Sequence, residues 1–171
     1  MSETSGTIGT MKIIITDTGM YPGKIGIEDR VFRPKSRIRP CNGCFECWTK
    51  TPGVCTQQDD AKDLGWLLSK CEELTIISWC FHGSFSPFVQ MVIERTLPYT
   101  QPGMEIRQGR MRHTVRYNNH IHINVCFYDE NITEEEKATA ETMVKEWAEE
   151  IRQPKPEIHW YADAWQIGEF Q

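Results

Sequence analysis

Three short apolar runs rich in β-branched side chains constrain the fold of this 171-residue chain more than any other feature. They cover residues 11–16, 73–79 and 121–128. Continuous apolar strands of this kind are typical of parallel sheets, in which both faces of a strand are buried. We expect a brief further strand at 30–33 and a last one at 157–161.

Helical patterns separate these strands. Apolar side chains recur every three or four residues over about 60–71, and a Ser-Pro pair at 86–87 begins a helix that ends at Pro98. A capping box at 133–136 opens a helix whose apolar stripe runs to Ile151. Alternating strands and helices predict one α/β domain with a parallel sheet.

Two stretches between these elements lack a regular pattern. Residues 17–29 hold too many glycines and prolines for a stable helix, and residues 98–118 are predicted to be irregular. The small, polar residues 1–10 are predicted to be a disordered leader, so the domain covers 11–171. Ligands of parallel sheets bind beyond the carboxyl ends of the strands, where we expect the cysteine-rich run described next to lie.

Four of the seven cysteines fall within fifteen residues, Cys41–Cys55, with the spacing C-x2-C-x2-C-x7-C. Four thiols so spaced can wrap one tetrahedral metal ion or one cubane cluster. Gly43 permits a backbone conformation that side chains disfavour, and the Thr-Pro-Gly turn at 51–53 should return Cys55 toward the other three. The alternative is a group of reduced thiols that bind no metal.

Cysteine usage and charge narrow the class of protein. No apolar run approaches about eighteen residues and no signal-peptide pattern is present, so we expect a cytoplasmic protein without a membrane partner. Clustered cysteines in a reducing compartment bind metal or act in redox chemistry. The net charge is −5, yet residues 24–50 carry seven Lys and Arg against three acids. Such cations would stabilise an anionic thiolate cluster, and no nucleic-acid partner is expected.

The sequence resembles the flavodoxin-like superfamily, and within it the group of NADPH-dependent FMN reductases and iron–sulfur flavoproteins. The resemblance spans about 11–152 and implies a three-layer, doubly wound parallel sheet in the order 2-1-3-4-5. In this chain the first helix would be shortened or missing, because residues 17–29 leave too little room for it. The residues that carry the resemblance are Pro40–Trp48, Cys55, Asp59-Asp60 and Ser78–Arg95.

The resemblance also implies cofactors. Members of the group bind FMN at the carboxyl edge of the sheet, and the iron–sulfur members hold a 4Fe-4S cluster in a compact four-cysteine motif. Carried over to this chain, the cluster ligands are Cys41, Cys44, Cys47 and Cys55. The flavin-contacting loop falls on Trp79, Cys80, Phe81, His82, Gly83 and Ser84. Only Thr16–Gly19 hints at a phosphate loop, so the candidate phosphate ligands are Arg107, Arg110 and Arg112, or a partner subunit.

The implied activity is that of an NAD(P)H-dependent FMN reductase-like oxidoreductase. Electrons would pass from NAD(P)H or another donor through FMN, and through the four-cysteine cluster to a one-electron acceptor, in a homodimer or higher oligomer. Two alternatives stay open. One is a cofactor-free flavodoxin-like partner or scaffold protein that has lost flavin binding. The other is a structural zinc site at the same four cysteines.

Overall fold

The computed structural model describes residues 11–19, 21, 23–153 and 155–169, so the predicted leader at 1–10 lies outside the described residues. None of the helices in this part of the chain is long and apolar enough to cross a membrane.

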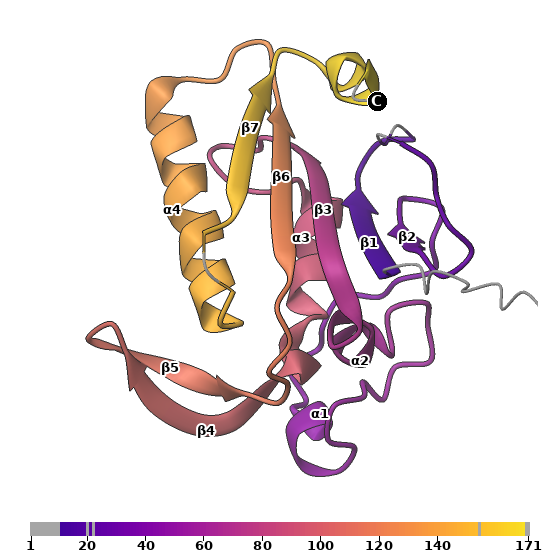
Figure 1. Ribbon diagram of the computed structural model, residues 1–171, viewed down its shortest axis with the longest axis vertical. Helices are drawn as coiled ribbons and strands as arrows, with labels where there is room; N and C mark the ends of the chain where they lie inside the picture. Colours follow the sequence, from indigo (N-terminus) through magenta and orange to yellow (C-terminus); the bar gives the residue numbers. More distant parts are fainter. Residues whose placement is uncertain (1–10, 20, 22, 154, 170–171) are drawn as a thin grey trace, which may run out of the picture.

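A five-stranded sheet forms the centre of the molecule (Figure 1). Neighbouring strands pair in the order β2-β1-β3-β6-β7, and every pair is parallel. Counted within the sheet alone, this is the predicted order 2-1-3-4-5, and the parallel α/β class is confirmed. The strands are β1 (Met11–Thr16), β2 (Arg30–Phe32), β3 (Cys71–Trp79), β6 (His122–Tyr128) and β7 (Glu157–Tyr161).

Three helices cover one face of this sheet. Their buried side chains share one core with alternate strand residues, among them Ile13, Ile15 and Ile76. The two predicted start signals are confirmed, because the Ser86 side chain accepts a hydrogen bond from the third residue of its helix and the capping box at 133–136 is complete. The helices are α2 (Leu64–Leu68), α3 (Pro87–Glu94) and α4 (Glu134–Glu150).

The opposite face of the sheet has a thinner cover. Ile77 and Cys126 form a second, small core with Ile167 of η2 (Ala164–Glu169), which is a 3-10 helix. No α-helix in the described part of the chain contributes to this core. Between β1 and β2 the chain is likewise free of helix wherever it is described, as predicted. Of the three layers expected, the sheet and one helical layer are present in full. The second helical layer is represented by the 3-10 helix η2.

The helix predicted over 60–71 is too long. Helix α2 ends at Leu68, and Cys71 already begins β3, where its thiol is 1% exposed. The apolar spacing that suggested a helical face continues into the strand, so periodicity alone places this boundary wrongly.

The stretch at 98–118, predicted to be irregular, contains a hairpin of β4 (Thr100–Arg107) and β5 (Arg110–Val115). The two residues between the strands, Gln108 and Gly109, have φ of 50° and 75°. Positive φ at both positions matches a type I′ turn, whose twist suits a two-residue hairpin. The strands are largely polar and exposed, which is why no apolar alternation revealed them.

Candidate functional site

The cysteine-rich run Cys41–Cys55 lies at the edge of the sheet where the strands begin. Helix α3 begins just beyond the carboxyl end of β3 and runs back toward the edge where the strands begin. Arg95, at the end of α3, donates a hydrogen bond to Arg39 O at 2.7 Å, and Arg39 lies just before the run. Helix α1 (Glu46–Thr49), inside the run, is anchored by Trp48 Nε1, which donates to Leu97 O at 3.2 Å. Figure 1 shows α1 and α2 at the end opposite the strand tips. The expectation that the cysteines lie at the carboxyl edge is wrong.

Short-range backbone contacts fold the run back on itself. Gly53 N donates to Cys47 O at 2.9 Å, and Cys55 N donates to Lys62 O at 2.9 Å. Gly53 has φ of 88°, and a Cβ there would lie 3.0 Å from the Tyr117 hydroxyl. The positive φ favours glycine here, whereas the contact could be relieved by movement of the Tyr117 and Arg116 side chains. The predicted turn at 51–53 is confirmed.

The four thiols of the run influence one another. Cys47 is 7% exposed, and burial together with the charges of Cys55, Cys41 and Cys44 raises its pKa to about 11. Cys44 is exposed and sits between Gly43 and Phe45, which have φ of 66° and 54°. Within the described residues no three Cys, His, Asp or Glu side chains are yet arranged as metal ligands. A metal would therefore require the loop to close as the thiols lose protons.

The buried guanidinium of Arg95, beside Cys55, indicates whether the residues of this site suit a metal ion or an iron–sulfur cluster. The Arg95 side chain is 1% exposed and donates to both carboxylate oxygens of Asp59, at 2.7 and 2.9 Å. Its Nε is buried and has no hydrogen-bond partner among the residues that the structure describes. Burial alone would lower the pKa of Arg95, but Asp59 and the nearby Cys55 raise it. A thiolate or cluster sulfide beside Cys55 would supply the missing acceptor, so the donor set fits a soft metal or iron–sulfur cluster.

The cations that precede the run are partly free. Arg37 pairs with Asp60 at 3.6 Å, whereas Arg33, Lys35 and Arg39 form no ion pair with any described residue. These exposed side chains remain available to offset negative charge at the cysteines.

The predicted flavin loop, Trp79–Ser84, lies at the other edge, directly after β3. Phe81 N donates to Ser84 O at 2.9 Å and Ser84 N to Phe81 O at 3.0 Å, which closes a tight turn. Gly83 has φ of 76°, and a Cβ there would lie 2.9 Å from Thr139 Cβ. The glycine therefore allows close packing on α4. Trp79 and Phe81 stay exposed, while Cys80 is buried and its pKa is raised by burial.

The charge at this edge does not suit a flavin phosphate. The Asp17 carboxylate, where a phosphate loop would begin, accepts from Trp79 N at 2.8 Å and from the Tyr128 hydroxyl at 3.0 Å. An adjoining cavity of about 410 Å³ is lined by three acids, and no Lys or Arg is among its described lining residues. Phosphate sites rely on backbone amides or cations. The residues present do not fit FMN here; the acids are Asp129, Glu130 and Asp163.

The arginines considered as phosphate ligands are engaged elsewhere. Arg107 donates to Glu149 O and to Glu150 O, carbonyls that end α4, and so caps the negative end of that helix. Arg110 and Arg112 both pair with the carboxylate of Glu146. These contacts tie the hairpin to α4, and the expectation of a phosphate site from these arginines is not supported within this chain.

Sequence reasoning missed two features of these sites. Asp59 and Arg95 fall within the stretches that carry the resemblance, but no local pattern indicates that they pair, because they lie 36 positions apart. His113 falls in the stretch 98–118 that was predicted to be irregular, although it lines a cavity next to Trp48. Neither the scan against protein-family models nor the search of curated proteins finds a match for this chain.

Proposed function

We propose that this chain is a flavodoxin-like redox protein whose cysteine-rich run Cys41–Cys55 holds a 4Fe-4S cluster. The observation that carries the proposal is a buried Arg95, whose Nε has no partner among the described residues, next to Cys55, which is one of four mutually interacting thiols. The strand order of the sheet supports the flavodoxin-like assignment. FMN is left out, because the acidic carboxyl edge does not fit its phosphate.

The chain's own residues have distinct roles in this proposal. Cys41, Cys44, Cys47 and Cys55 would be the ligands, and a bound cluster would supply one-electron transfer. Arg95 would donate a hydrogen bond beside Cys55 and add positive charge, which favours the more negative, reduced state. Cys44, the exposed thiol, marks the side from which a partner can approach.

Metal and sulfide analysis of protein made without oxygen tests this function. We expect about four iron and four sulfide per chain, as in a four-iron cluster. The variant Cys44→Ser should lose most of this iron, whereas Cys126→Ser, a buried thiol of the second core, should keep it. One zinc and no iron in wild type would instead establish the structural zinc site, and the redox proposal would be abandoned.

A second candidate is a cofactor-free partner protein. The acidic carboxyl edge and the absence of preformed metal geometry among the described residues favour it. Protein that stays colourless and takes up neither zinc nor added iron and sulfide would support this candidate over the first.

A further inference from the structure

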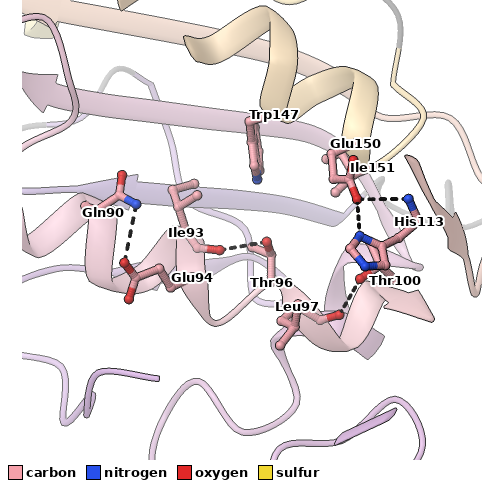
Figure 2. Close-up of a pocket in the computed structure, with 10 residues that line it drawn as sticks. All are labelled: Gln90, Ile93, Glu94, Thr96, Leu97, Thr100, His113, Trp147, Glu150 and Ile151. Atoms are coloured by element: carbon pink, nitrogen blue, oxygen red, sulfur yellow. Dashed lines mark hydrogen bonds and ion pairs between the residues drawn. The ribbon is translucent and has the colours of Figure 1, made fainter. Parts of the chain in front are cut away.

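A cavity of about 230 Å³ lies between α3, η1 (Leu97–Tyr99), β5 and α4. Its walls are mostly apolar, and Figure 2 shows Ile93, Leu97, Trp147 and Ile151 facing it from three of these elements. An apolar cavity of about 150 Å³ can hold benzene. This cavity therefore has room for a molecule of one or two rings.

One end of the cavity carries an imidazole–carboxylate pair. His113 Nδ1 lies 2.6 Å from Glu150 Oε1, and the same oxygen accepts from His113 N at 3.1 Å. Since a carboxylate can only accept, a neutral ring must donate from Nδ1, which leaves Nε2 as an acceptor. The Trp48 ring packs on the imidazole with centroids 5.0 Å apart and holds its orientation. No described residue bonds to His113 Nε2.

Few of the other polar side chains that line the cavity have a hydrogen-bond donor that is not already used. Thr96 and Thr100 use their hydroxyl protons on carbonyl oxygens three residues earlier, at 2.7 and 2.9 Å. Gln90 donates to Glu94 at the rim. The indole nitrogen of Trp147 points into the cavity in Figure 2 and has no hydrogen-bond partner among the described residues. Within the described part of the chain, Trp147 Nε1 is thus a free donor and His113 Nε2 a free acceptor. At the rim the Gln90 amide keeps a second N–H and its carbonyl oxygen, and Glu94 keeps acceptor oxygens.

We propose that this cavity binds a small, uncharged phenol of one or two rings. The aromatic body fills the apolar walls, and the hydroxyl donates to the imidazole nitrogen that His113 leaves free. A carboxylate is disfavoured, because Glu94 and Glu150 line the cavity and no unpaired Lys or Arg does so among its described lining. The proposal does not require a metal at the cysteines, although Trp48, which packs on the imidazole, belongs to the cysteine-rich run.

Three probes with the same p-tolyl ring test the proposal at neutral pH on the full chain: p-cresol, p-xylene of nearly equal shape, and the slightly larger p-toluate. Binding is followed by amide and indole NMR signals, with the exposed Trp165 at the far edge as the internal reference. We expect p-cresol to shift the Trp147 indole signal saturably. The hydroxyl-free p-xylene should bind about fivefold more weakly, the usual effect of one hydrogen bond. The anionic p-toluate should bind at least about tenfold more weakly.

Variants distinguish a hydrogen bond to the His113 imidazole from simple occupancy of the cavity by an apolar ring. His113→Phe should abolish the preference for p-cresol over p-xylene while both still bind. The control His122→Phe alters another histidine near a glutamate, 3.6 Å from Glu157 and outside the cavity, and should change nothing. Gln90→Trp at the partly exposed rim should block both ligands. The proposal is overturned if p-cresol gives no saturable shift, if p-xylene binds equally well, or if His113→Phe keeps the preference.

Discussion

Arg95 and Asp59 place two full charges where side chains are almost completely buried, at 1% and 3% exposure. The two-point contact compensates much of the cost of removing both from water. Asp59 also accepts from Arg39 N at 2.9 Å and from Ala61 N at 3.1 Å. One carboxylate therefore joins the segments before and after the cysteine-rich run to the end of α3.

Removing this carboxylate should be far more damaging than removing its neighbour. We expect Asp59→Asn to lower the free energy of unfolding by about 3–5 kcal/mol, because the buried guanidinium loses its counterion. Asp60→Asn is the matched control, since Asp60 is 41% exposed and faces an Arg37 that is 89% exposed. Exposed pairs contribute about 1 kcal/mol or less. Urea unfolding measures both, and equal losses would contradict the assignment.

The same pair predicts a pH dependence. Burial alone would raise the pKa of Asp59, but hydrogen bonds from Arg95 and Arg39 and the Arg95 charge lower it overall. A lowered folded-state pKa gives stability that is complete above the unfolded value, about pH 4, and is lost as the pH falls through the folded value. In urea unfolding from pH 7 to 3, the advantage of wild type over Asp59→Asn should shrink on acidification. An advantage that grows would show the opposite shift.

At the scale of elements, α2 and η1 pack unusually closely beneath the sheet. A Cβ placed at Gly65 would lie 2.7 Å from Pro98 Cβ and 2.9 Å from Tyr99 N. Backbone atoms cannot rotate away as a side chain can. The glycine at the second position of α2 is therefore explained by packing against η1, although glycine has a low helix propensity.

Gly65→Ala should destabilise the protein, although alanine is the better helix former by about 1 kcal/mol. We expect a net loss of about 1–3 kcal/mol in the free energy of unfolding, because the two elements must move apart. Gly19→Ala is the control, since nothing lies within 4 Å of a Cβ there. It should change stability by less than about 0.5 kcal/mol. A stabilised Gly65→Ala variant would mean that propensity outweighs the clash.

Elements that depend on local pattern could be predicted from the sequence, and those that depend on distant contacts could not. The strand at Met11–Thr16 and the helix cap at Thr133 were predicted because their signals lie within a few residues. The hairpin was missed because Gln-Gly is a weaker turn signal than Asn-Gly and its strands are polar. The position of the cysteines was missed because the path of residues 33–40 decides it, through contacts with Asp59 and Asp60.

At the scale of the whole molecule, the sheet separates two chemically different ends. The end where the strands begin carries the four thiols and the buried Arg95, with the exposed Arg39 just before the cysteine-rich run. The carboxyl end carries the exposed rings of Trp79 and Phe81 and the carboxylates of Asp17 and Asp129. Strand β3 has nine residues, which at about 3.3 Å each puts the two ends about 25–30 Å apart. A flavin at one end and a cluster at the other would not be in contact within one chain.

This separation of charge predicts how the protein discriminates between flavins. Burial and the Asp17 charge raise the pKa of Tyr128, so its hydroxyl stays neutral, and the charge at the carboxyl edge comes from the carboxylates. A phosphate placed there would face carboxylates, and we expect FMN to bind no more tightly than riboflavin, which lacks the phosphate. Fluorescence quenching measures both affinities. If FMN binds more weakly than riboflavin, added salt should reduce the difference between the two affinities, because screening weakens the repulsion between phosphate and carboxylates. If FMN bound with micromolar affinity, and at least about tenfold more tightly than riboflavin, a phosphate site would exist. FMN would then have to be included in the proposed function.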